Sequence, residues 1–291
     1  MNTSISHLPA PRQDQLKMIT AIIKEVIRPE KIILFGVFAK EARESDIFLN
    51  QPYPAASSFY DILIVTQRGE RRGDYIVLDH VEGRCHSQFS VSVLAHGIDY
   101  VNKRLAEGQY FFEMIRREGI LLYDAGNIPF AEAPKLDLAQ IRAKAQHDFN
   151  RCWFQAKAFL NSARFNQEQQ ERKVAAFLLH QAAEQAYMAI LLAYTGYKPC
   201  THNLEKLRRY TIRFSLALES LFHRTTPEGD QLFKLLLRSY VDARYKENFS
   251  ISDNELALLI DRISRLLSIA ENICKNRFLS LEKMAAAESK P

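Results

Sequence analysis

Apolar and polar positions follow a pattern that changes near the middle of the chain. In residues 1–125, short apolar runs of strand length are interspersed with segments whose apolar residues recur every three or four positions. This pattern predicts helices over residues 14–27 and 97–119, the latter divided at Gly108. The predicted strands cover residues 31–36, 60–66, 74–81, 86–96 and 120–124. Such a mixture predicts an α+β domain with a small mixed sheet over residues 1–125.

The second half of the chain has helical spacing throughout. Residues 126–136 carry two prolines and a glycine without periodicity, so we predict a linker there. The predicted helices that follow cover residues 136–165, 169–197, 202–222, 225–245 and 252–278. Five such helices with short connections predict an all-α five-helix bundle over residues 137–280. We expect residues 281–291 to form a disordered tail.

Several predicted helix ends carry capping residues. Gly196 is placed to end the second of the five helices. Thr226 is the predicted N-cap of the fourth, with Pro227 at its first helical position. Ser252 and Glu255 have the spacing of a capping box and predict the start of the fifth helix.

The composition narrows the class of protein. Apolar residues make up 47% and charged residues 25%, which is typical of a globular chain. No apolar run approaches the roughly 20 residues needed to cross a bilayer, and the first residues lack the layout of a secretory signal. Four scattered cysteines without a CxxC pair favour a reducing cytoplasm over a disulfide framework or zinc knuckle.

Charge is spread unevenly along the chain. The net charge is +5, yet residues 1–128 hold 15 Lys and Arg against 16 Asp and Glu. The remainder holds 24 against 18, a net of +6. A basic second half is compatible with a polyanionic partner such as RNA, although exposed helix faces are often rich in Lys and Arg for solubility alone.

Three stretches of the first half resemble a nucleotidyltransferase domain of the DNA polymerase β superfamily. They are "KIILFG", "SSFYDILIVT" and "VNKRLAEGQYFFEMIRREGILLYD". The second half resembles a HEPN domain, the helical bundle also found at the end of sacsin, through "LLHQAAEQAYMAILLAYTGYKPCTHNLEKL" and "YVDARYKENFSI". Together the resemblance covers about residues 15–278 and implies a fusion of the two domains.

The resemblance to nucleotidyltransferases implies a loop that binds phosphate at a helix N-terminus. That family carries Gly-Ser at this point, where backbone N–H groups hold a triphosphate. Here Gly36 is followed by Val37, so the hydroxyl is missing. We expect Gly36, Val37 and Lys40 to contact phosphate if the loop still binds it. The alternative is that Gly36 only turns the chain from a strand into a helix.

The resemblance also implies a site for two Mg²⁺ ions held by Asp-x-Asp on one strand and a third carboxylate on its neighbour. Asp61 occupies the second position of the pair, while Phe59 stands at the first, and an aromatic ring cannot bind a hard cation. The later strand offers Ser90 and Ser92 instead of an acid. We therefore expect Asp61 to be a catalytic remnant and at most a weak Mg²⁺ ligand. Substitute carboxylates would have to come from Glu41, Glu44 or Asp79.

The resemblance to HEPN ribonucleases implies an arginine followed after four to six residues by a histidine that acts in acid–base chemistry. Arg244 is present, but no histidine follows within that spacing. Arg244, Tyr245 and Lys246 remain candidates to bind a phosphate and stack on a base. The alternative is that Arg244 pairs with an acid such as Asp242 or Glu184.

Further candidates for a HEPN cleft are His180, Glu184 and His202. His180 and Glu184 are four residues apart and share a helix face, but a second histidine for a zinc motif is absent. We expect them to form a buried hydrogen-bonded pair. His202 sits at a helix start that Thr201 or Asn203 would cap. A series of tyrosines is expected in the core or at a dimer face: Tyr187, Tyr194 and Tyr197.

Three hypotheses follow for function. The first is a protein that binds a nucleotide such as ATP, or RNA, with an impaired or inactive transferase site. The second is an active nucleotidyltransferase that adenylylates a small molecule, as aminoglycoside-modifying relatives do, or a protein tyrosine such as Tyr245, as in toxin–antitoxin pairs. The third is a structural module that forms a homodimer through the helical bundle.

Overall fold

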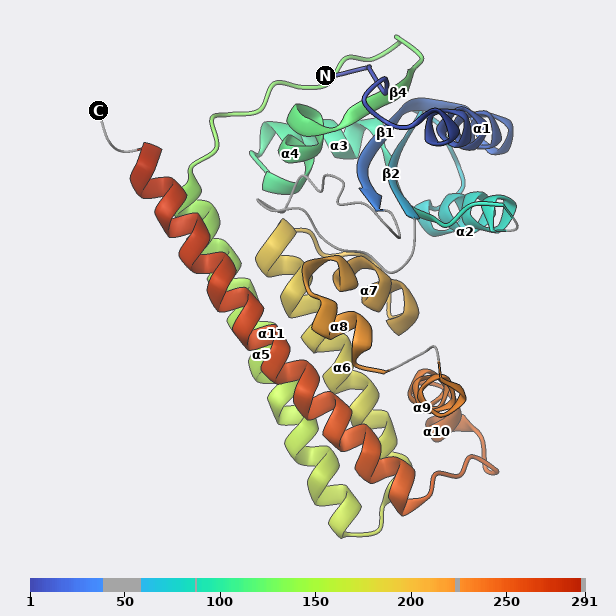
Figure 1. The fold of residues 1–291 in the computed structure, drawn as a ribbon, viewed down its shortest axis with the longest axis vertical. Coiled ribbons are helices and arrows are strands. Elements are labelled where there is room, and N and C mark those ends of the chain that lie inside the picture. Colours follow the sequence, from blue (N-terminus) through green and yellow to red (C-terminus); the bar gives the residue numbers. More distant parts are fainter. Residues whose placement is uncertain (39–58, 87, 223–225, 289–291) are drawn as a thin grey trace. The chain divides into compact units, whose positions relative to one another are not determined.

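The chain folds into two compact units, Met1–Leu136 and Asp137–Pro291 (Figure 1). The structure is a computed structural model and describes residues 1–38, 59–86, 88–222 and 226–288 of the 291. The segment 126–136, predicted as a linker, has no helix or strand and belongs to the first unit.

The first unit is built on a mixed sheet, as predicted, but the sheet has four strands and not five, in the order β3-β2-β1-β4. β1 is antiparallel to both β2 and β4, whereas β2 and β3 are parallel. The strands are β1 (Pro29–Phe38), β2 (Phe59–Thr66), β3 (Val91–Gly97) and β4 (Ile120–Asp124). The helices of this unit are α1 (Ala10–Val26), α2 (Asp74–Cys85), α3 (Ile98–Ala106) and α4 (Tyr110–Glu118).

Helices cover both faces of this sheet. On one face, Leu16, Ile19 and Ile23 of α1 pack with α2 and the sheet in one core cluster. On the other, Phe111 of α4 meets Phe35 of β1 edge to face, with ring centroids 5.9 Å apart. Because neither face meets water, the central strands are apolar at almost every position instead of alternating.

The segment 74–81 was predicted as a strand, and this is wrong because it forms the first part of α2. Val77, Val81 and Cys85 recur every four residues and are all fully buried, which is the spacing of one helix face. The run of three apolar residues at 76–78 resembled a buried strand because short apolar runs do not distinguish the two structures. The predicted division at Gly108 is confirmed: this glycine has φ +69° and separates α3 from α4.

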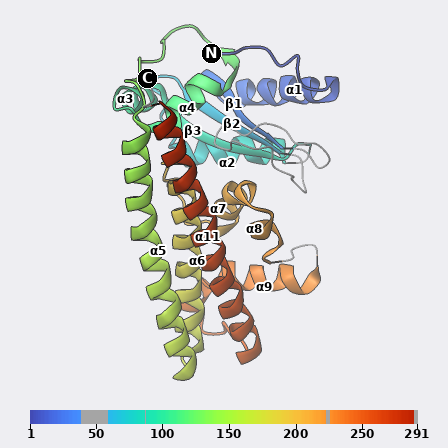
Figure 2. The same ribbon diagram turned by 60° about the vertical axis from the view of Figure 1, so that its left-hand side comes forward.

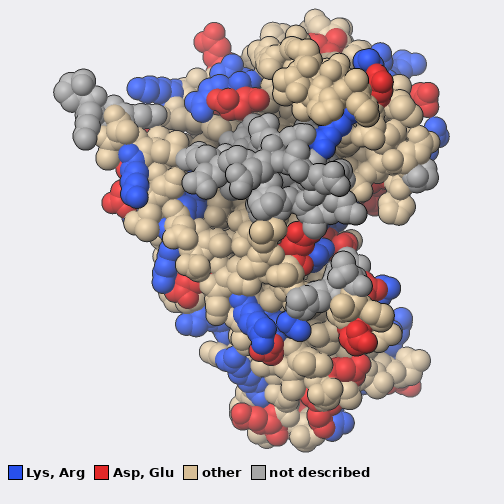
Figure 3. Space-filling model, in the orientation of Figure 1, with Lys and Arg blue, Asp and Glu red and all other residues tan. Residues whose placement is uncertain are grey.

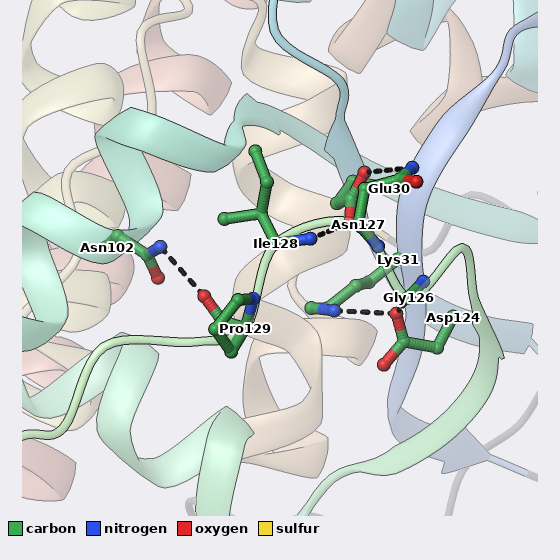
Figure 4. A network of polar contacts seen from close by, with 8 residues as sticks. All are labelled: Glu30, Lys31, Asn102, Asp124, Gly126, Asn127, Ile128 and Pro129. Atoms are coloured by element: carbon green, nitrogen blue, oxygen red, sulfur yellow. Dashed lines mark hydrogen bonds and ion pairs between the residues drawn. The ribbon is translucent and has the colours of Figure 1, made fainter.

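A buried carboxylate holds the chain after β4 against the sheet (Figure 4). Glu30 is 1% exposed, and its Oε1 accepts hydrogen bonds from the backbone N–H groups of Asn127 (3.1 Å) and Ile128 (2.7 Å). Its Oε2 accepts from Asn127 Nδ2 at 3.1 Å. Further along, Asn102 Nδ2 donates to the carbonyl of Pro129 at 3.0 Å. The start of the predicted linker is therefore an ordered part of the first unit.

Three long helices form the frame of the second unit: α5 (Leu138–Glu168), α6 (Arg172–Thr195) and α11 (Asp253–Glu288) (Figures 1 and 2). The shorter helices in the described part of the unit are α7 (Leu204–Thr211), α8 (Leu216–Ser220), α9 (Pro227–Arg238) and α10 (Asp242–Tyr245). α6 is buried on nearly every side because it carries many alanines, which let its neighbours approach closely.

Two of the five predicted helices are broken. The segment 202–222 divides into α7, a 3₁₀ turn at Ile212–Phe214, and α8, since Ser215 has extended backbone and caps α8 with its side chain. The segment 225–245 divides into α9 and α10 at a turn that begins with Ser239. There the hydroxyl of Ser239 donates to the carbonyl of Leu235 at 2.8 Å.

The predicted helix ends are confirmed. Gly196 ends α6 with φ +65°. Thr226 caps α9 by accepting a hydrogen bond from Gly229 N, with Pro227 at the first position. Ser252 and Glu255 form the reciprocal capping box, with Ser252 N donating to Glu255 Oε2 at 2.8 Å and Glu255 N to Ser252 Oγ at 3.3 Å.

The predicted disordered tail is helical as far as Glu288, because α11 continues through it. Leu281 is 1% exposed and extends the buried face of α11 beyond Phe278. Glu282 also pairs with Arg142 of α5 at 3.3 Å. The alanines at 285–287 favour helix further.

Charges of both signs are interspersed on the face of the molecule in Figure 3. No helix in the described part of the chain combines the length and apolar composition of a membrane span.

We expect Glu30→Ala to destabilise the first unit by about 2 to 3 kcal/mol, because three donors lose their acceptor and two of them are backbone N–H groups. Urea denaturation and hydrogen exchange at the amides of Asn127 and Ile128 would measure this. Glu25→Ala is the matched control: Glu25 is exposed and 3.4 Å from Arg84, so its removal should cost less than about 0.5 kcal/mol. Equal losses in both variants would contradict the assigned role of Glu30.

Candidate functional site

Asp61 lies inside the sheet of the first unit. It is in register with Gly36 of β1 on one side and with Ser92 of β3 on the other, and its side chain is fully buried. The sheet thus brings together Gly36, Asp61 and Ser92, the three positions compared with the nucleotidyltransferase motifs above. Of these, only Asp61 carries a carboxylate. Within the described ranges, no three Asp, Glu, His or Cys side chains gather where they could hold a metal ion. Asp79 lies at an exposed position of α2.

Gly36 and Val37 lie inside β1, which corrects the prediction that the strand ends at Gly36. β1 continues to pair with β2 as far as Phe38 and Phe59, after a shift in register between Leu34 and Gly36. This pairing gives hydrogen-bond partners to the backbone N–H and C=O groups at the start of β2. Lys40, Glu41, Glu44 and the side chain of Phe59 lie outside the described residues.

In the second unit, aromatic and basic side chains from three elements meet around Tyr240. The ring of Tyr240 stacks on His180 of α6, with centroids 4.9 Å apart and planes inclined by 30°. It also stacks with Phe177 at 6.4 Å and with His202 at 6.0 Å. The guanidinium of Arg244 lies 4.3 Å from the same ring. We call Phe177, His180, His202, Tyr240 and Arg244 the Tyr240 cluster.

Arg244 is held in place without an acidic partner. Its Nε donates to the carbonyl of Tyr240 at 2.6 Å, and its guanidinium also lies 5.1 Å from the ring of Phe177. Asp242, one of the two acids expected to neutralise Arg244, instead pairs with Lys246 at 2.9 Å. The side chain of Arg244 is exposed, and its two Nη groups form no hydrogen bond or ion pair with any residue that the structure describes. The guanidinium is therefore oriented and available to an anion.

Glu184, the other expected partner of Arg244, is bound elsewhere. It is 4% exposed, and its Oε1 lies 2.9 Å from Nδ1 of His202. Its Oε2 is buried and accepts no hydrogen bond from the described part of the chain. The prediction that Glu184 and His180 form a hydrogen-bonded pair is wrong: both are buried, but Glu184 faces His202, and Nδ1 of His180 lies 3.4 Å from Nε2 of Gln181.

Burial lowers the pKa of His180 to about 3, with the nearby charges of His202 and Arg244 acting in the same direction. His180 is 1% exposed, so its imidazole is neutral in the folded protein at ordinary pH. The side chain of His202 is 70% exposed, and its Nδ1 faces Glu184. Asn203, one of the two predicted capping residues, is the cap of α7 and accepts a hydrogen bond from Lys206 N.

Three of the five residues of the Tyr240 cluster were predicted from the sequence, but its centre was not. Arg244, His180 and His202 were candidates, yet no histidine was expected near Arg244 because none follows it in sequence. The structure supplies two histidines from α6 and from the segment before α7. Phe177 and Tyr240 were missed, and the only signal for Tyr240 was its position four residues before Arg244, one helical turn away. Tyr187, Tyr194 and Tyr197 are core residues, as predicted, with 0 to 8% exposure.

Residues 149–275 match the HEPN domain, so the chain contains a HEPN domain. The match lies within the second unit and includes every residue of the Tyr240 cluster. No curated protein matches the chain.

Protein stability should fall as the pH drops below about 6.5. The unfolded chain protonates His180 near that pH, whereas the folded protein keeps it neutral down to about 3, so the unfolded state binds the extra proton. Urea denaturation should show a slope from His180 approaching about 1.4 kcal/mol per pH unit between pH 6 and 4.

The variant His180→Phe keeps a ring against Tyr240 and should lose this component of the slope. His147→Gln, which changes an exposed histidine of α5, should retain it. Parallel pH profiles for the wild type and His180→Phe would show that His180 is not the group responsible.

Proposed function

We propose that the HEPN domain binds a nucleotide or a single RNA strand, with phosphate at Arg244 and a base on Tyr245. The observation that carries this proposal is the exposed guanidinium of Arg244, oriented by the carbonyl and ring of Tyr240 and left without an acid. Its free edge suits a phosphate, which a guanidinium can bind through two parallel hydrogen bonds.

Neighbouring side chains support the same ligand. Tyr245 is 73% exposed, and its ring lies 5.0 Å from the Arg244 guanidinium, so a base stacked on it would place its phosphate near that charge. His202 adds a second exposed nitrogen-bearing side chain to the cluster. Lys173 of α6 donates to the carbonyls of Lys246 and Glu247 at 3.2 and 2.7 Å, which holds the segment after α10 in place. HEPN domains are usually linked to nucleotides or RNA, in agreement with this ligand.

The first unit is, in this proposal, a nucleotidyltransferase-like domain with a degenerate two-metal site and little or no transferase activity. The register of the sheet supports the proposal because Gly36 and Ser92 flank Asp61 and neither supplies a second carboxylate. Asp61 itself is fully buried. Two divalent ions would need several oxygen ligands from the protein.

Arg244→Ala should weaken binding of a fluorescently labelled single-stranded oligoribonucleotide by about tenfold or more, because charge-assisted hydrogen bonds are lost. Arg244→Lys should recover part of the affinity, since a lysine keeps the charge and loses the planar fork. Fluorescence anisotropy at fixed salt would measure both. The control is Arg265→Ala on α11, an exposed arginine 3.0 Å from Asp261, which should leave binding unchanged.

Tyr245→Ala should also weaken binding of the oligoribonucleotide, because the ring on which a base would stack is lost. Tyr245→Phe should keep the affinity, since stacking needs the ring and not the hydroxyl. If neither the oligoribonucleotide nor ATP, GTP or CTP binds in titration calorimetry, the proposed function is wrong.

Incubation with labelled ATP and Mg²⁺ tests the proposal for the first unit. We expect no transfer of label to the protein or to small-molecule acceptors. Transfer that disappears in Asp61→Asn would show an active transferase and overturn the degenerate-site proposal. Circular dichroism of Asp61→Asn would establish that loss of transfer is not loss of folding.

A further inference from the structure

His202 joins a buried carboxylate to the exposed side of the Tyr240 cluster. Its Nδ1 lies 2.9 Å from Oε1 of Glu184, which is 4% exposed, whereas 70% of the His202 side chain is exposed. The ring of His202 also lies nearly parallel to that of Tyr240, with 11° between the planes and 6.0 Å between the centroids. These two contacts hold the imidazole with one nitrogen turned inward, which leaves Nε2 on the exposed side of the ring.

The carboxylate of Glu184 determines which nitrogen of His202 carries the hydrogen in the neutral ring. A carboxylate only accepts hydrogen bonds, so the hydrogen is on Nδ1 and Nε2 is an acceptor. The other oxygen of Glu184, Oε2, is buried and accepts no hydrogen bond within the described ranges. A proton taken up by His202 is therefore added at Nε2, and it converts this exposed nitrogen from an acceptor into a donor.

The charges around His202 come from three helices. On α6, the carboxylate of Glu184 favours the protonated ring, whereas His180 stays neutral because burial, followed by the charges of His202 and Arg244, lowers its pKa to about 3. On α10, the positive charge of Arg244 opposes protonation. The first turn of α7 carries one acid and one base: Glu205 and Lys206.

We propose that His202 is a second contact for the phosphate of the ligand and that it acts only when protonated. This inference rests on the proposed function, because it concerns the same ligand at Arg244. The guanidinium of Arg244 and the ring of His202 both lie against Tyr240, the former 4.3 Å from its ring. A protonated Nε2 adds a charged donor beside the arginine, so acidification strengthens binding.

The neutral form of His202 does not provide this contact. Phosphate oxygens of an RNA strand are acceptors, and so is Nε2 of the neutral ring, which means that neither group supplies a hydrogen. Arg244 keeps its charge over the range in which imidazoles titrate, and His180 stays neutral there. Within the Tyr240 cluster, His202 is therefore the group whose charge changes near neutral pH.

Fluorescence anisotropy of a labelled oligouridylate at fixed ionic strength tests this inference, since uracil does not titrate in the range used. The wild type should bind about fivefold or more tightly at about pH 5.5 than at about pH 8, because a charged donor is gained. His202→Phe keeps a ring against Tyr240 and should bind almost equally at the two pH values. Far-ultraviolet circular dichroism at both pH values should show that each variant is folded.

Three further variants separate His202 from other groups. His147→Gln, which changes an exposed histidine of α5, should leave both the affinity and its pH dependence unchanged. His180→Phe should keep the ratio of the two affinities, because His180 is neutral at both pH values. Glu184→Gln keeps the shape of the side chain and removes its charge, so it should reduce this ratio.

Proton uptake gives an independent readout. Calorimetry at about pH 6.5 in two buffers with different ionisation enthalpies should show that binding takes up part of a proton in the wild type and none in His202→Phe, since ligand and proton favour each other's binding.

Equal wild-type affinities at the two pH values, or an undiminished ratio in His202→Phe, would overturn this inference. Binding that depends on Arg244 and is independent of pH would overturn this inference alone and leave the proposed function intact. Absence of binding at every pH would overturn the proposed function, and this inference with it.

Discussion

The close approach of neighbouring helices to α6 is the constraint on which the second unit depends. Alanine at many positions of α6 leaves little side-chain volume between it and its partners, so the helix is buried on nearly every side. Its buried residues nevertheless include the polar side chains of His180 and Glu184. Burial of such groups is costly unless other parts of the chain satisfy them. The His202 imidazole meets Glu184, and Nε2 of Gln181 lies 3.4 Å from Nδ1 of His180, whose ring also stacks on Tyr240.

The same contacts explain why Arg244 is exposed and yet oriented. Tyr240 packs against α6 and contributes both a ring and a carbonyl to the arginine that follows one turn later. Glu184 is already engaged by His202 and Asp242 by Lys246, so neither neutralises the guanidinium. An exposed, oriented guanidinium thus arises as a consequence of packing around α6, and the HEPN match covers all of these residues.

The first unit shows a different relation between packing and chemistry. Its sheet is covered on both faces, and Asp61 lies in its interior between a glycine and a serine on the flanking strands. The Glu30 carboxylate extends this ordered region into the chain after β4, so the boundary between the units falls later than the last strand. The net positive charge of the chain comes from its second half, which also contains the exposed Arg244.

Local patterns were sufficient to determine much of this protein. Helix caps at Thr226 and Ser252, the break at Gly108 and the frame of long helices followed from sequence because these features depend on residues a few positions apart. The helix at 74–85 could not be predicted, because a short apolar run is compatible with both a strand and a helix. The interruptions in segments 202–222 and 225–245 could not be predicted either, because a continuous helical period does not show where tertiary contacts will break the helix. Only the tertiary structure decided that His180 and His202 meet Arg244 around Tyr240. These three residues are separated by 22 to 64 positions along the chain. They become neighbours because His202 and Arg244 lie against α6, the buried helix that carries His180, and their spacing in the sequence does not predict this contact.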